Sequence, residues 1–239
     1  MARTIEHRNA IRSSLAVAFA VSAYGLSFGA LSVTAGLTVW QTSVMSLLMF
    51  SGGSQFAVIG IIASGGASAG VAAIASGALL GARNGLYSMR MAPIIGGTWR
   101  RKLLAAQITI DESTAVAIAQ PTLPSQRVGF WWTGTAIYIG WNLTTLAGAL
   151  LGDALGDVRQ YGLDAAAAAA FLGLLWPRLK DLQPVVVAIA AAVVAALLTP
   201  ALPAGLPVLA AAVVAVVVGL TNWLGRSKRI VPAASEDPS

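Results

Sequence analysis

Residues 49–93 read MFSGGSQFAVIGIIASGGASAGVAAIASGALLGARNGLYSMRMAP. A stretch this apolar is typical of membrane-spanning helices, yet two of its features are costly inside lipid. Residues 51–55 form a polar cluster, SGGSQ, which weakens a helix in the middle of a hydrophobic run. Arg83 places a permanent positive charge, with Asn84 beside it, in the apolar run that follows. Both features therefore require a structural or a functional reason.

The composition around this stretch is that of a helical membrane protein. Hydrophobic residues make up 57% of the 239, charged residues make up 10%, and the mean hydropathy is +0.77. The lysines and arginines behind the net charge of +6 are spread over short connections and the two ends of the chain. Because they form no single stripe, positively charged cytoplasmic loops explain them better than nucleic-acid binding does.

Several classes of chemistry are not expected from this composition. The chain has no cysteine and one histidine, His7, which excludes disulfides, thiolate metal sites and histidine-rich zinc sites. It also lacks the phosphate-binding motif of P-loop ATPases and the HExxH motif of metalloproteases. We therefore expect neither an enzyme nor a bound cofactor or metal.

The apolar residues fall into runs that predict an all-α, polytopic membrane protein with about eight hydrophobic segments. The first run follows a basic N-terminus and is longer than the roughly 7 to 15 residues of a signal-peptide core, so we interpret it as a span. We predict one transmembrane transporter domain over residues 1–225 and a polar cytoplasmic tail over 226–239. The runs cover about residues 13–36, 42–64, 68–93, 103–120, 128–151, 162–176, 184–198 and 206–223.

Two of these runs are interrupted. Gly52 and Gly53 split the second, and Asp111 with Glu112 interrupts the fourth, so we expect broken or re-entrant helices there. If all eight runs cross, the basic cluster at 99–102 lies on the wrong side for the positive-inside rule. If both interrupted runs are re-entrant, six runs cross and the cluster becomes cytoplasmic. Both termini are cytoplasmic in either arrangement.

Glycines also recur at four-residue spacing in the third run, at Gly77, Gly81 and Gly85. Residues with this spacing lie on one face of a helix. Small residues on one face let a neighbouring backbone approach closely, so we expect tight helix packing along this face.

The charged residues inside the runs have two explanations. Arg83 either forms an ion pair with Asp111 or Glu112 that locks helices together, or its planar guanidinium receives the carboxylate of a substrate. Adjacent helical residues point about 100 degrees apart, so one acid can meet Arg83 while the other meets a substrate amine or a proton. If the fourth run lies at the membrane interface, both acids are in water instead.

The SGGSQ cluster completes the candidate site. Where a helix breaks in a membrane, freed backbone groups line a cavity, and a helix N-terminus favours an anion. The alternative is a kink whose polar groups are satisfied by neighbouring helices. Tyr87, one turn beyond Arg83, either steadies the guanidinium or packs in the core. The predicted substrate-binding set is Gly52, Gly53, Ser54, Gln55, Arg83, Asn84 and Tyr87, and the predicted groups for proton coupling or ammonium binding are Asp111 and Glu112.

Three motifs in this part of the chain resemble those of the AzlC family, the large subunit of two-component branched-chain amino acid exporters. They are FSGGSQF at 50–56, RNGLY at 83–87 with MAP at 91–93, and IDES at 110–113. The family motifs are close to FxGAxQF, NxRHxxYxxxxAP and TDES, and order and spacing agree over residues 14–120. Gly81 stands where the family usually has asparagine, and Asn84 stands where it usually has the histidine that could carry a proton.

The resemblance implies a multi-pass exporter in the bacterial inner membrane that moves Val, Leu and Ile, with Met as a further expected substrate. It also implies coupling to the proton motive force and a small AzlD-like membrane subunit as partner in the lipid bilayer. We expect Phe56 and Leu86 to receive the aliphatic side chain. The alternatives are a non-transporting scaffold or assembly subunit, and an exporter of another small amphipathic metabolite.

Overall fold

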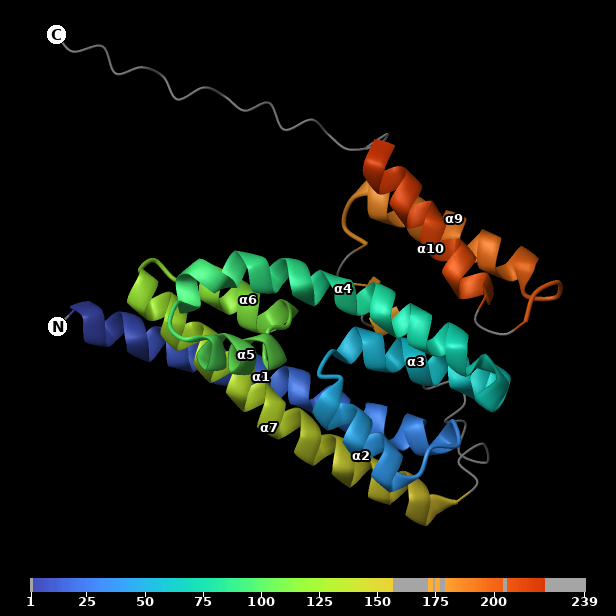
Figure 1. The fold of residues 1–239 in the computed structure, drawn as a ribbon, viewed down its shortest axis with the longest axis horizontal. Helices are drawn as coiled ribbons and strands as arrows, with labels where there is room; N and C mark the ends of the chain where they lie inside the picture. Colours follow the sequence, from blue (N-terminus) through green and yellow to red (C-terminus); the bar gives the residue numbers. More distant parts are fainter. Residues whose placement is uncertain (1, 157–171, 174, 177–178, 204–205, 222–239) are drawn as a thin grey trace, which may run out of the picture.

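The computed structural model describes residues 2–156, 172–173, 175–176, 179–203 and 206–221, and in this part of the chain all regular structure is helical (Figure 1). Most of the predicted run at 162–176 and the predicted tail at 226–239 lie outside the described residues. The elements are α1 (Ala2–Thr34), α2 (Val39–Leu48), α3 (Gly52–Gly65), a short 3-10 turn η1 (Gly66–Ala69), α4 (Gly70–Ile95), α5 (Trp99–Gln107), α6 (Asp111–Ile118), α7 (Leu123–Leu155), α9 (Leu182–Leu198) and α10 (Leu206–Thr221).

Helices α1 and α7 form the long axis of the molecule and run parallel, side by side (Figure 1). Near their first turns, the Thr122 hydroxyl donates to the Glu6 carboxylate at 2.8 Å. Further along both helices, the Thr144 hydroxyl donates to the Ser22 carbonyl at 2.6 Å. The residue numbers of the contact partners increase together along both helices, so the two helices point the same way.

The predicted break in the second run is confirmed, but it lies just ahead of the glycines. Helix α2 ends at Leu48, the chain turns at residues 49–51, and Gly52 and Gly53 are the first residues of α3. Helix α3 then runs back along α4, so that α2 and α3 enter and leave at the same end of the molecule (Figure 1). The second run is therefore a V of two short helices with its tip near the middle of the molecule.

The fourth run forms a second V, which enters from the opposite end. Helix α5 follows the end of α4, and α6 begins at Asp111 after a turn at residues 108–110. A Cβ added at Gly134 would lie 2.9 Å from the Ile108 carbonyl oxygen, and one at Gly129 would lie 3.4 Å from the Val116 carbonyl oxygen. Helix α6 therefore runs antiparallel to α7. Both interrupted runs have the geometry expected of re-entrant segments.

The tips of the two V shapes are held together by side chains that bind free carbonyl groups. The Gln107 amide donates to the Leu47 carbonyl at 2.8 Å, and the Tyr138 hydroxyl donates to the same carbonyl at 3.1 Å. The Gln55 amide donates to the Met49 carbonyl at 2.8 Å. Since the last carbonyls of a helix have no partner within it, these bonds satisfy the broken end of α2.

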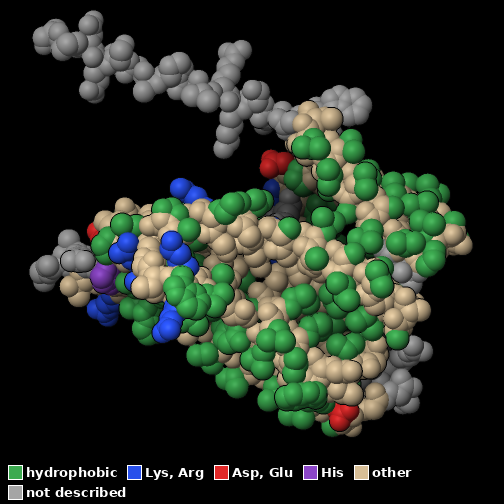
Figure 2. All heavy atoms as spheres, viewed as in Figure 1, with side chains coloured by type: hydrophobic (Ala, Val, Ile, Leu, Met, Phe, Trp, Pro, Cys, Tyr) green, Lys and Arg blue, Asp and Glu red, His purple; other side chains and the backbone are tan. Residues whose placement is uncertain are grey.

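Basic side chains gather at the end of the molecule where α1, α5 and α7 begin (Figure 2). Arg127 lies at this end and donates from Nε to the Ile94 carbonyl at 2.6 Å, which caps the end of α4 with a positive charge. The exposed basic residues here are Arg8, Arg12, Arg100, Arg101 and Lys102.

The rest of the described surface is largely apolar, as expected of a helical membrane protein (Figure 2). By length and hydropathy alone, Thr4–Thr34 and Gly52–Ile95 are candidate spans, and α9 and α10 are shorter apolar helices. Exposed leucines and valines on these helices are suited to lipid rather than water.

The glycine face of α4 is tightly packed at one position only, so the prediction for the other two was wrong. A Cβ added at Gly77 would lie 2.8 Å from Val58 Cγ2, so the Val58 side chain would have to move to make room for it. At Gly81 the distance to Ser54 Oγ is an ordinary 3.6 Å, and at Gly85 nothing lies within 4 Å. The reason is that α3 begins at Gly52, opposite Gly81, so α3 does not extend alongside Gly85.

Candidate functional site

A cavity of about 350 Å³, which we call the central cavity, lies between α1, α3, α4, α6 and α7. It sits where both V tips meet, near the midpoints of the long helices. One wall is polar and one is apolar, as in small-molecule sites. The polar wall consists of Ser51, Gly52, Gly53, Arg83, Asn84, Asp111 and Glu112. The apolar wall consists of Val21, Tyr24, Phe50, Phe56, Ile110, Ile137, Trp141 and Leu175.

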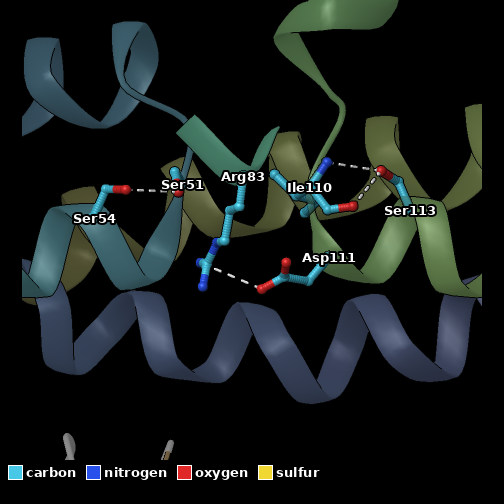
Figure 3. Close-up of polar contacts among 6 residues, drawn as sticks. All are labelled: Ser51, Ser54, Arg83, Ile110, Asp111 and Ser113. Carbon is cyan, nitrogen blue, oxygen red and sulfur yellow. Dashed lines mark hydrogen bonds and ion pairs between the residues drawn. The ribbon is translucent and has the colours of Figure 1, made fainter. Parts of the chain in front are cut away.

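Arg83 and Asp111 face each other across the polar wall (Figure 3). Arg83 Nη2 lies 3.3 Å from Asp111 Oδ2, and the two side chains remain 30% and 23% exposed. Arg83 comes from the middle of α4 and Asp111 is the first residue of α6, so the pair joins two elements that are separate in sequence. Of the two explanations considered for Arg83, the structure has the ion pair, with Asp111 as the partner, and because the pair lines the cavity it also remains within reach of a ligand.

The start of α3 forms the side of the cavity next to Arg83. A Cβ added at Gly53 would lie 2.9 Å from Arg83 Nη2, so the absent side chain is what lets the guanidinium lie against the helix end. Ser51 precedes the helix, and its hydroxyl lies 3.0 Å from the Ser54 hydroxyl (Figure 3). Free amides at a helix N-terminus and an adjacent guanidinium both favour an anion.

The start of α6 forms the opposite side and carries the two acids. The Ser113 hydroxyl accepts from the Ile110 amide at 3.0 Å (Figure 3). It also donates to the Ile108 carbonyl at 2.8 Å, and the two bonds fix the turn before the helix. Asp111 and Glu112 occupy the first turn, where the helix dipole stabilises negative charge. The site therefore presents carboxylates and a guanidinium from opposite sides of one cavity.

Trp141 is the main contributor that the sequence did not assign to the site. Its ring stacks on Phe28, with centroids 6.1 Å apart, and meets Phe56 edge-on at 6.4 Å. A Cβ added at Gly52 would lie 3.2 Å from Trp141 Cη2, so Gly52 leaves space for the indole. A tryptophan beside Asn142 in an apolar run is typical of helix packing, so nothing in the sequence pattern singles it out as a site residue.

Several predicted residues do not line the central cavity. Gln55 is fully buried and binds the backbone of the break, as expected if the kink is satisfied internally. Ser54 faces a neighbouring cavity instead, and Tyr87 is absent from the lining. Of the two expected wall residues, Phe56 lines the cavity, whereas Leu86 is 62% exposed on the outer face of α4 and was wrongly placed.

Two Gly-x-Ser-x-Gly patterns, at 25–29 and 66–70, do not have the context of a hydrolase nucleophile. That motif works at a sharp turn between a strand and a helix. Here the first pattern lies inside α1, and the second covers η1 and the first residue of α4. Among the described residues there is also no group of three or more His, Asp or Glu side chains that could hold a metal ion.

Comparison with protein families matches residues 16–155 to a model described as AzlC protein. This range holds α7, both V-shaped segments, α4 and most of α1. Comparison with curated proteins and with solved structures gives no match.

Proposed function

Because the chain belongs to the AzlC family, we propose that it is the large subunit of a secondary exporter that moves branched-chain amino acids out of the cell with the proton motive force. The observation that carries the proposal is the Arg83–Asp111 pair on the wall of a cavity that is polar on one side and apolar on the other.

A zwitterionic amino acid matches the charges of the polar wall. Its carboxylate is recognised by the Arg83 guanidinium and the amides at the start of α3. Its ammonium group meets Asp111 or Glu112 on the opposite side. Because the substrate carries one charge of each sign, it can insert between Arg83 and Asp111 without leaving either group uncompensated in a low-dielectric site.

The aliphatic side chain is received by the apolar wall. Phe56, Ile137 and Trp141 offer hydrophobic and aromatic surface on the side away from the charges. Such a wall discriminates weakly between side chains that differ by one methylene group. This suits a transporter that accepts Val, Leu, Ile and Met alike.

Coupling to protons is assigned to the acids of α6. When the ammonium group leaves, one carboxylate loses its cationic partner, and protonation then compensates it. Arg83 remains charged throughout, since a guanidinium does not lose its proton in proteins. The exchange of ammonium for a proton on Asp111 or Glu112 therefore links export to the proton gradient.

The orientation follows from the basic end of the molecule. Placing that end in the cytoplasm of a bacterial inner membrane obeys the positive-inside rule for the starts of α1, α5 and α7 together. In the topology that we propose, both interrupted runs are re-entrant, six runs cross and both termini are cytoplasmic. A small AzlD-like membrane subunit completes the exporter.

Efflux from vesicles tests the proposal. Proteoliposomes that contain this chain and the AzlD-like subunit are loaded with radiolabelled leucine, and a pH gradient is imposed. We expect leucine efflux that depends on both subunits and collapses when a protonophore removes the gradient. Efflux of neither leucine nor any other branched-chain amino acid, with both subunits present, would favour a scaffold role. Efflux of a different small amphipathic metabolite would change the proposed substrate but support the proposed exporter function.

Gly53→Ala is expected to weaken leucine binding without unfolding the protein. The new methyl group would lie 2.9 Å from Arg83 Nη2 and would push the guanidinium away from the start of α3. We expect the apparent KM for leucine counterflow to rise about tenfold, equivalent to roughly 1.4 kcal/mol. Gly85→Ala, on the open side of α4, is the matched control and should leave KM unchanged. Equal KM values in the two variants would contradict a role for the contact between Gly53 and Arg83 in leucine binding.

A further inference from the structure

A second cavity, of about 530 Å³, adjoins the central cavity between α2, α3, α4 and the end of α5. We call it the lateral cavity. Phe50, Ser51 and Asn84 line both cavities. The two spaces are therefore separated by a wall that is one side chain thick.

The lateral cavity is more polar than a lipid-facing groove should be. Ser51, Ser54, Asn84 and Gln107 all line it, and these residues lie at the depth of the two V tips. Figure 2 looks onto this face, where backbone and polar side chains interrupt the hydrophobic surface between α4, α2 and α5. Gln107, Ser51 and Ser54 have partners within the protein, but Asn84 Oδ1 is buried without a hydrogen-bond partner. Hydrocarbon cannot supply that partner, so water or a polar solute suits the space better than acyl chains do.

Two of the three residues that form this wall lie in irregular backbone. Phe50 and Ser51 belong to the break between α2 and α3, where the helical hydrogen-bond pattern is interrupted. The Phe50 ring is held by an edge-on contact with Tyr138, with centroids 5.0 Å apart at 76°. Segments without regular helical bonds open at lower cost than helix interiors do. The wall is thus located where movement is least costly.

The lateral cavity extends away from the basic end of the molecule. Its α4 lining runs from Ile74 to Asn84, and all but Asn84 lie in the N-terminal half of that helix. The basic end lies where α4 finishes (Figure 1).

We propose that the lateral cavity is the outward half of the export path, and that Phe50, Ser51 and Asn84 form the barrier between it and the substrate site. The assignment of its direction rests on the proposed function. Displacement of Phe50 at the break joins the two cavities and opens a route from the Arg83–Asp111 pair to the extracytoplasmic side.

Thiol labelling tests the path, and the absence of native cysteine makes single-cysteine variants clean probes. A charged, membrane-impermeant methanethiosulfonate is added outside intact cells. Ala78→Cys reports on the lateral cavity, and Leu79→Cys, the next residue of α4 and 51% exposed, is the lipid-facing control. We expect Ala78→Cys to react at least about tenfold faster, because the charged reagent needs an aqueous route.

The barrier is tested with a third probe, Val21→Cys, which lies on the central cavity. Its external labelling is expected to be slow, and to rise at least about tenfold when Phe50→Ala removes the ring from the wall between the two water-accessible spaces. If Phe50→Ala does not yield folded protein, Asn84→Ala is used instead as the variant that opens the wall.

Equal labelling of Ala78→Cys and Leu79→Cys, or no effect of either wall variant on Val21→Cys, would overturn the inference. Labelling needs no amino acid, so its outcome is independent of the leucine efflux that tests the proposed function. If leucine efflux were absent but the labelling pattern were as expected, the proposed substrate would be rejected and the proposed path would stand.

Discussion

Arg83→Ala is expected to reduce leucine counterflow about 30-fold, because truncating one member of a buried charge pair costs about 2 to 5 kcal/mol and this partly exposed pair belongs at the lower end of that range. The variant removes the guanidinium that we propose recognises the substrate carboxylate, and it also removes the ion pair that Asp111 makes with Arg83 at 3.3 Å. Counterflow in proteoliposomes with both subunits measures the effect directly. It isolates substrate exchange from the proton gradient.

Two further variants separate the charge from the geometry. Arg83→Lys keeps a cation but loses the planar fork, so we expect a rate between those of the alanine variant and the unmodified protein. Arg90→Ala removes an exposed arginine from the same helix and should transport normally. Unchanged counterflow in a folded Arg83→Ala protein would refute the assignment of Arg83 to the substrate.

The central pair could be anticipated from sequence because charge inside an apolar run is so costly. Arg83 in the middle of α4 and two acids in the fourth run are each unfavourable in lipid, and their proximity compensates both. The break in the second run was likewise signalled by its glycines and polar residues. What sequence could not give was the side on which each residue lies: Gln55 and Leu86 are separated from the cavity by helix rotation alone.

The direction of the broken segments was also beyond the sequence. A weak point in an apolar run is equally compatible with a kinked crossing and with a return to the same side. The choice depends on tertiary contacts, here the Gln107 and Tyr138 bonds to the Leu47 carbonyl and the antiparallel packing of α6 on α7. These contacts join residues far apart in the chain, which local pattern does not report.

The two V segments form an inverted pair that local sequence conceals. Each consists of a short helix, a three-residue turn at 49–51 or 108–110 and a second short helix, and each is followed by a long helix. They enter from opposite ends, and α4 and α7 run in opposite directions (Figure 1). Transporters built from inverted repeats bind substrate near the midplane between broken helices. The Arg83–Asp111 pair lies between the two tips, as that architecture requires.

Gly29→Ala is expected to destabilise the fold by about 3 kcal/mol, at the upper end of overpacking effects, which corresponds to roughly 6–12 °C in Tm for a chain of this size. A Cβ at Gly29 would collide with the Thr145 carbonyl oxygen and lie 2.6 Å from the Ala149 amide. Both obstacles are backbone, so no side chain can rotate away. Helices α1 and α7 must separate instead.

That separation reaches the central cavity because α1 and α7 both contribute to its apolar wall. Val21 and Tyr24 come from α1 and Ile137 and Trp141 from α7, so the variant should lose leucine counterflow along with stability. Gly219→Ala, where nothing lies within 4 Å of the added methyl group, is the matched control and should keep both. Thermal unfolding in detergent measures the stability. If Gly29→Ala had the same Tm as the control, the close approach of α1 and α7 would not be what holds the cavity together.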